Sequence, residues 1–182
     1  DPEVAEASLA AAAPSRPDDA VALVLVNLGT PSAPEPGPVR AFLREFLSDR
    51  RVIEMNPFLW KPILEGIILR VRPREVSRKY RSIWLEQGSP LMHYTREQAR
   101  LLGERLPDVR VEVAMRYGQL SIGAALDRLH AQGVRRVAVL PAYPHYSATT
   151  VASINDAVCA WIGRNRDGFE MRLHRSFPAS PA

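Results

Sequence analysis

Cysteine is almost absent from this 182-residue sequence, in which Cys159 is the only one. A single thiol cannot form an intrachain disulfide, and it cannot build a metal cage from several thiolates. The cysteine content therefore excludes a small disulfide-stapled fold and fits a reducing compartment.

The sequence also lacks a long hydrophobic run. No stretch of about eighteen consecutive apolar residues is present, so no segment is predicted to span a membrane. Residues 1–19 carry early acidic residues and no continuous apolar region, which does not fit a signal peptide, and their alanines and prolines predict a disordered lead-in. Because the chain opens on Asp1 without a methionine, we expect a fragment of a longer protein.

Several short catalytic and nucleotide-binding motifs are missing. The sequence contains no G-x-x-x-x-G-K, no G-x-G-x-x-G, no G-x-S-x-G and no H-E-x-x-H. Its histidines are far apart, at His93, His130, His145 and His174. His145 lies between tyrosines after a predicted strand, and a metal-binding role for it stays open as the less favoured alternative. The residues alone therefore show no complete catalytic constellation.

The charge balance is basic, with a formal net charge of +4 and an isoelectric point near 9.6. Anionic partners are compatible with this charge, but the arginines are spread along the chain, so nucleic acid is not favoured as a partner. The hydrophobic fraction of 46% is sufficient for a sizeable core. We therefore expect residues 20–182 to form one domain.

The strongest structural signal is the sequence VALVLVNLGTP at residues 21–31. Its β-branched apolar run is typical of a strand buried on both faces, and it ends in a Gly-Thr-Pro turn. Further strands are predicted at residues 109–115, 137–140 and 169–173, with helices between them. This alternation predicts an α/β fold, a doubly wound four-stranded parallel sheet of the Rossmann-like type.

The carboxyl ends of these strands are where a ligand is expected to bind. They comprise residues 27–31, 116–118 and 142–147, and two of them supply arginine, tyrosine, histidine and serine. Helix starts are predicted from capping residues. Ser121 caps one helix, Thr149 or Thr150 caps a later one, and Thr95 with Gln98 forms a capping box that opens a helix ending before Pro107.

A long insertion, residues 31–107, separates the first two strands. After a proline-rich loop, apolar residues at 39, 42, 43, 46 and 47 predict a short helix, and residues 55–69 are strongly apolar but interrupted by Pro57 and Pro62. This segment either lines an apolar pocket, rests on a membrane surface, or forms a helix buried beneath the sheet. Arginines at 70, 74, 78 and 81 follow at helical spacing, either as a solvated face or as partners for carboxylates at the rim of an apolar ligand.

Several motifs, in order and in spacing, resemble ferrochelatase. They are LVNLGTP, VRAFLREFLSDRRVI, KYRSIW with GSPL, MRYG and PAYPHYSATT, and they extend over roughly residues 21–177, about the first half of that family's catalytic chain. The resemblance implies a lyase-class metal chelatase of two similar α/β halves, which inserts ferrous iron into protoporphyrin IX to form protohaem in haem biosynthesis. This chain would be the N-terminal chelatase half.

The resemblance also implies roles for individual residues. Arg116 and Tyr117 match a pocket-lining pair, which we assign to catalysis. The implied porphyrin-binding positions are Leu28, Arg72, Tyr80, Ser89, Tyr143, Tyr146 and Ser147. The segment from Phe58 to Leu69 resembles the apolar lip that admits the porphyrin and touches a membrane, and Arg72 lies close behind it to pair with a propionate.

The chain departs from the family's pattern at the metal. The family's metal-handling histidine, in a Ser-Ala-His-Ser motif, and its glutamate are in the second half, so we expect no metal ligand here and no turnover by this chain alone. Ala148 stands where relatives have an iron–sulphur cysteine, so no cluster and no permanently bound cofactor are expected; ferrous iron and protoporphyrin are substrates.

The expected partners are a porphyrin, the missing C-terminal half and a membrane surface contacted peripherally through Phe58 to Leu69, without nucleic acid. The expected location is the cytoplasm, with membrane association open. Two alternatives remain: a related tetrapyrrole chelatase, and a non-catalytic porphyrin-binding module. A downstream Ser-Ala-His-Ser motif and glutamate would favour the enzyme.

Overall fold

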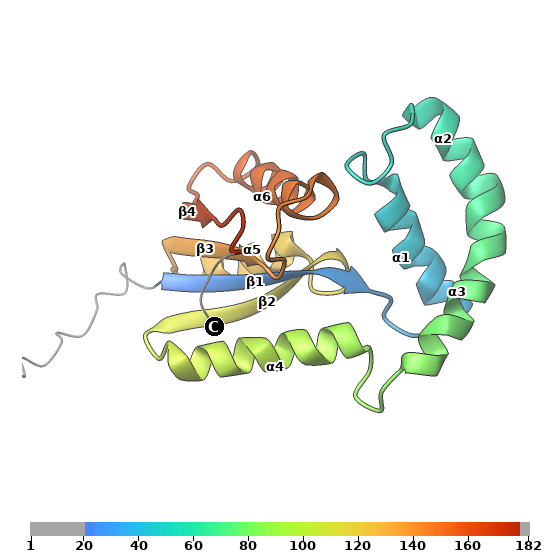
Figure 1. Ribbon diagram of the computed structural model, residues 1–182. Helices are drawn as coiled ribbons and strands as arrows, with labels where there is room; N and C mark the ends of the chain where they lie inside the picture. The colour runs from blue at the N-terminus through green and yellow to red at the C-terminus, as the bar shows by residue number, and fades with distance from the viewer. Residues whose placement is uncertain (1–20, 179–182) are drawn as a thin grey trace, which may run out of the picture.

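A computed structural model describes residues 21–178 and shows four strands in one sheet (Figure 1). They are β1 (Val21–Thr30), β2 (Val109–Gly118), β3 (Arg136–Pro141) and β4 (Glu170–Leu173). Every pairing between them is parallel, in the order β2-β1-β3-β4, which confirms the predicted α/β sheet. The lead-in predicted for residues 1–19 lies outside the described residues.

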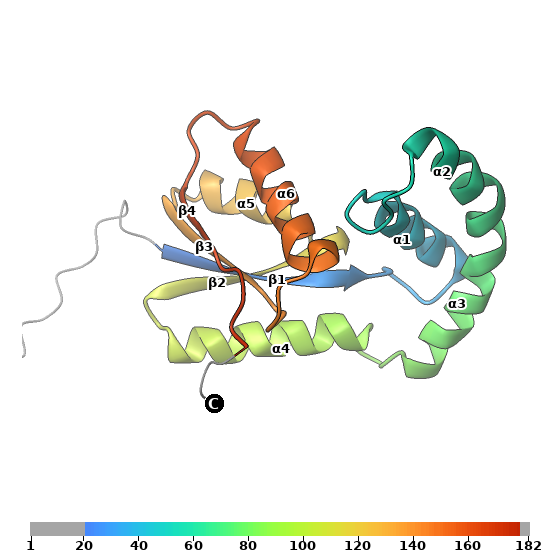
Figure 2. The same ribbon diagram turned by 45° about the horizontal axis from the view of Figure 1, so that its top comes forward.

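Helices lie on both faces of the sheet (Figures 1 and 2). α5 (Ile122–Ala131) and α6 (Ser153–Ile162) cover one face, and α4 (Pro90–Arg105) lies along the other. Alternate residues of β1 are enclosed in the core beneath α5 and α6, namely Ala22, Val24 and Val26. Leu25 is buried on the α4 side, so β1 is apolar on both faces, as parallel strands between helical layers usually are.

The first part of the insertion forms a helical arm, by which we mean residues 36–83. It consists of α1 (Pro36–Ser48), α2 (Pro57–Ile63), the π-helical turn η3 (Leu64–Ile68) and α3 (Leu69–Ile83). Figures 1 and 2 show the arm beyond the carboxyl end of β1, to one side of the sheet. α1 packs against α3, and its buried positions recur at the predicted helical spacing: Val39, Phe42, Leu43 and Leu47.

The apolar segment at residues 55–69 is not buried beneath the sheet, so that alternative is wrong. Leu64 and Leu69 turn inward and are 2% and 1% exposed, but Phe58 is 89% exposed and Ile67 is 59% exposed. The physical reason is position: the arm lies past the strand ends, where no helical layer of residues 21–178 covers its outer side. The helical arginines that follow at 70, 74, 78 and 81 are exposed as well.

Two predicted helix starts are wrong and one is confirmed. Ser121 caps α5 by accepting the Ala124 amide at 3.3 Å. α4 begins at Pro90 after Ser89, because proline suits the first turn of a helix, and Thr95 therefore lies buried inside it. Thr149 and Thr150 lie inside the π-helical turn η4 (Ala148–Ala152), which precedes α6, so neither caps a helix.

Candidate functional site

The carboxyl ends of β1 and β2 approach each other so closely that glycine is required on both strands. In the ladder Gly29 pairs with Tyr117 and Thr30 pairs with Gly118. A Cβ on Gly29 would lie 1.9 Å from the Tyr117 carbonyl oxygen, and one on Gly118 would lie 2.6 Å from the Thr30 oxygen. Both glycines have positive φ. This close approach brings Leu28 of β1 beside Tyr117 of β2.

Three of the sequence-predicted site residues meet in one apolar cluster between the arm and the strand ends. Leu28 and Tyr80 pack, partly buried, against the cluster that contains Tyr117. Trp60 of α2 joins them, and its indole Nε1 donates to the Leu47 carbonyl at 2.7 Å. Burial raises the pKa of Tyr80. The arm and the sheet therefore share one apolar wall at this edge.

Arg116 and Tyr117 belong to a hydrogen-bonded network centred on Asp49, the residue that ends α1. The Asp49 Oδ2 accepts from Arg116 Nη2 at 2.7 Å, from the Tyr117 hydroxyl at 2.6 Å and from the Ser153 hydroxyl at 2.5 Å. Arg116 Nε also donates to the Ser153 carbonyl at 3.0 Å and to its Oγ at 2.6 Å. The guanidinium carbon lies 4.5 Å from the centre of the Tyr117 ring. The network thus fixes both side chains of the predicted catalytic pair.

The network also sets how its members ionise. Burial alone would raise the pKa of the Asp49 carboxyl, but hydrogen bonds from Ser153, Tyr117 and the Arg51 amide, with the charge of Arg116, bring it below its ordinary value. Burial, together with the hydrogen bond to Asp49, raises the pKa of Tyr117 to about 12. At neutral pH the site therefore holds a carboxylate, a guanidinium and a neutral phenol.

Sequence reasoning missed Asp49 and Ser153. Asp49 directly follows the helix predicted from the apolar positions 39–47, and Ser153 lies 104 positions away from it in the chain. Asp49 lies within the quoted stretch VRAFLREFLSDRRVI, but Ser153 lies outside every quoted motif, so spacing contains no signal for their contact. Arg116 and Tyr117 were found, and their assignment to catalysis stays a prediction.

The segment after β3 supplies three more predicted residues, which do not join this network. Tyr143 packs against the core under α5 and α6, and burial raises its pKa to about 12. A hydrogen bond with the Leu28 backbone acts in the opposite direction on this pKa. Tyr146 is exposed and lies under the Arg175 guanidinium at 4.7 Å, and the Ser147 hydroxyl is 2.9 Å from that of Thr149.

The two remaining predicted positions also lie outside the shared wall. Arg72 is exposed on α3, and Ser89 is buried at the start of α4, where its carbonyl accepts the His93 amide at 3.0 Å. The structure thus brings Leu28, Tyr80 and Tyr117 together with Arg116 and leaves the other predicted positions outside this cluster. Their assignments as porphyrin contacts stay predictions.

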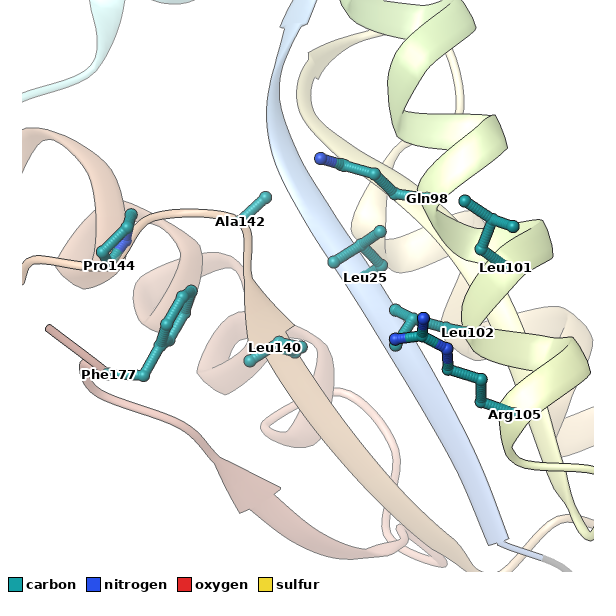
Figure 3. Close-up of a pocket in the computed structure, with 9 residues that line it drawn as sticks. All are labelled: Leu25, Gln98, Leu101, Leu102, Arg105, Leu140, Ala142, Pro144 and Phe177. Atoms are coloured by element: carbon teal, nitrogen blue, oxygen red, sulfur yellow. The ribbon is translucent and has the colours of Figure 1, made fainter. Parts of the chain in front are cut away.

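A cavity of about 440 Å³ lies on the α4 side of the sheet and is separate from these residues (Figure 3). Leu101 and Leu102 of α4 form one side of it, and Pro144 with Phe177 forms the other. None of the predicted site residues lines it. Nor do residues 21–178 contain a group of three or more His, Cys, Asp or Glu side chains that could hold a metal ion.

Comparison with known proteins gives one consistent result. A family model described as Ferrochelatase matches residues 20–182. The chain is 47% identical to Ferrochelatase 1 of Shewanella oneidensis over 91% of its own length and 51% of that protein. It is 49% identical to the ferrochelatase of Yersinia enterocolitica, over 88% of this chain and 50% of that protein, and 53% identical to that of Xylella fastidiosa, over 79% and 45%. The chain spans about half the length of the curated relatives it matches.

Proposed function

This chain belongs to the ferrochelatase family, and from that premise we propose that it forms one wall of a site where ferrous iron enters protoporphyrin IX to give protohaem. The observation that carries the proposal is the cluster in which the partly buried Leu28 and Tyr80 pack against the enclosed Tyr117, so that the arm and the strand ends share one apolar wall. A porphyrin is a large flat apolar ring, so it requires a wall of this kind. The propionates at its edge suit the exposed guanidinium of Arg72.

Metal insertion replaces two pyrrole protons of the macrocycle by one iron ion. The reaction therefore needs a base for the protons and ligands that deliver the metal. Arg116 is a cation and Tyr117 a neutral phenol with a raised pKa, so neither is suited to remove these protons. We propose that this chain holds and orients the ring, and that the base and the metal ligands come from the part of the relatives that it does not span.

Absorbance titration with protoporphyrin IX tests the proposal. We expect a red-shifted Soret band on binding, and we expect Arg72→Ala to weaken binding several-fold through loss of the propionate contact. Arg70→Ala is the matched control, because Arg70 is exposed on the same helix two positions earlier. The absence of any Soret change would refute the porphyrin wall. Equal effects of the two variants would refute the role of Arg72. Failure of iron insertion when a relative's second half is supplied would favour a binding module.

We propose in addition that the outer side of the arm makes a peripheral contact with a membrane. Its apolar side chains Phe58, Leu59 and Ile67 are 89%, 65% and 59% exposed. Across residues 21–178 no helix is both long and apolar enough to cross a bilayer. Side chains of this kind on a helix surface can enter the boundary between headgroups and acyl chains.

Flotation with phospholipid vesicles tests the membrane contact. Phe58→Ser combined with Leu59→Ser should abolish co-flotation of the chain. The control is Leu101→Ser combined with Leu106→Ser, which removes two exposed leucines near α4, 46% and 39% exposed, and should leave flotation unchanged. Equal flotation of the parent and the arm variant would rule out this contact.

A further inference from the structure

Asp49 lies where the helical arm meets both β2 and α6. Its donors come from two elements distant in the sequence, since Arg116 and Tyr117 end β2 and Ser153 begins α6. The other carboxylate oxygen, Oδ1, accepts the Arg51 amide at 2.7 Å. The Asp49 side chain is 8% exposed. Every part of this carboxylate is therefore engaged, and it joins three segments at one point.

A second ion pair also joins the helical arm to α6 and provides a comparison. Arg51, in the loop after α1, donates to both carboxylate oxygens of Asp156 in α6, at 2.7 and 3.0 Å. The side chains of Arg51 and Asp156 are 45% and 52% exposed, and Asp156 acts on Arg116 through its charge only. Exposed pairs of this kind contribute little to stability. The enclosed carboxylate of Asp49 is thus the contact that orients Arg116 and Tyr117, and the Arg51–Asp156 pair only bridges loop and helix.

Loss of the Asp49 charge would release both side chains. Arg116 would keep its bonds to Ser153 but lose its counter-charge, with a side chain that is only 20% exposed. An enclosed cation without its partner turns towards water or towards another anion. Tyr117 would lose a charge-assisted acceptor and keep Ser153, whose hydroxyl lies 3.1 Å away.

We propose that Asp49 is a positioning residue for the porphyrin site: its carboxylate fixes Arg116 and Tyr117 at the end of β2 and aligns the helical arm with the sheet. The effect of this role on ligand binding rests on the proposed function, because it requires that a porphyrin contacts the aligned wall. Asp49 itself lies behind the pair and acts through it.

The first experiment requires no porphyrin. The chain is prepared with tyrosine isotope-labelled at the phenolic carbon, whose chemical shift reports the hydrogen bond of the hydroxyl, and Tyr117→Phe identifies the resonance of Tyr117. Asp49→Asn removes the charge and keeps the side-chain shape, so the Tyr117 resonance should move. Asp156→Asn, the matched control, breaks the exposed ion pair and should leave that resonance in place.

The second experiment is the protoporphyrin titration of the same variants. We expect Asp49→Asn to weaken binding roughly tenfold, as loss of a charge-assisted contact does, and Asp156→Asn to change it less than about twofold. Should Asp49→Asn fail to fold, Asp49→Glu takes its place, because it keeps the charge and displaces the carboxylate by one methylene group. It should move the same resonance and weaken binding to a smaller extent.

The outcomes separate the two proposals. An unmoved Tyr117 resonance in Asp49→Asn overturns the positioning role, whatever the porphyrin does. Equal weakening by Asp49→Asn and Asp156→Asn also overturns it, because attachment of the arm would then be the whole effect. If the unaltered chain does not bind protoporphyrin, the proposed function fails, and the positioning of Arg116 and Tyr117 is decided by the resonance alone.

Discussion

Gly29 and Gly88 form a matched pair that measures how much the close approach of β1 and β2 at their carboxyl ends constrains the chain. Both have φ of +110°. A Cβ on Gly29 would lie 1.9 Å from the Tyr117 carbonyl oxygen and 2.8 Å from its carbonyl carbon, whereas a Cβ on Gly88 meets nothing within 4 Å. Alanine at either position suffers the same backbone strain, and only at Gly29 does it also collide with the neighbouring strand.

The two costs can be separated in magnitude. Backbone strain at such a φ costs about 1–3 kcal/mol, and this is the whole expected effect of Gly88→Ala. At Gly29 the obstacle is a backbone oxygen in the β1–β2 ladder, so the overlap is relieved only by moving the strands apart. We therefore expect Gly29→Ala to lower the free energy of unfolding by more than about 4 kcal/mol, in the range of severe substitutions.

Urea denaturation followed by far-ultraviolet circular dichroism provides the measurement. Both variants should keep the slope of the unfolding free energy against urea concentration. Their unfolding free energies should then differ only by the cost of the steric overlap at Gly29. A Gly29→Ala chain that does not fold, beside a Gly88→Ala chain that does, agrees with the prediction. Equal losses in the two variants would refute it, because the strand ends would then have room that the structure does not show.

Three further predictions concern ionisation and the core. The folded-state pKa of Asp49 is below its ordinary 3.8, so its contacts stabilise the fold above pH 3.8 and lose this effect as pH falls. In urea titrations, the difference in unfolding free energy between the parent and Asp49→Asn should therefore narrow below about pH 4. The raised pKa of Tyr117 acts in the opposite range: its contribution is present below pH 10 and lost as pH rises towards about 12, so Tyr117→Phe should have a shallower alkaline limb. Trp161 is 1% exposed, and its indole Nε1 donates a hydrogen bond to Asp127 at 2.7 Å. Trp161→Ala should lower the free energy of unfolding by about 3–5 kcal/mol in the same urea denaturation.

The sheet could be predicted from the sequence because its signals are local. The run at residues 21–26 is apolar at every position, and a strand that is buried on both faces requires that composition. The start of α4 could not be predicted from Thr95, because its hydroxyl serves a distant partner. It donates to the Leu91 carbonyl at 2.7 Å and accepts from the Asn27 side chain at 3.0 Å, an arrangement that exists only after α4 packs on β1.

The candidate site was likewise only partly predictable from the sequence. Tyr117 could be located from its strand end, since parallel strands finish at one edge. Its hydrogen-bond acceptor could not, because Asp49 reaches it across 68 positions through the fold of the whole arm. Burial of Tyr117 to 1% exposure likewise depends on α1 and on Phe46, whose ring meets it edge-on at 5.2 Å. Sequence therefore located the edge of the sheet at which these side chains lie, and tertiary packing decided how they are held.

The apolar run at residues 55–69 of the helical arm contains both buried and exposed side chains. Leu64 and Leu69 are enclosed and attach the arm to the shared wall, so folding already accounts for them. Phe58, Leu59 and Ile67 contribute no such contact, and leaving a side chain of this size in water instead of burying it forgoes about 1.5–3 kcal/mol each. Because folding gains nothing from their apolar character, the free energy they can still release is available to whatever covers them. A membrane surface against α2 would recover it, and this is why the outer side of the arm, rather than the buried one, carries the proposed membrane contact.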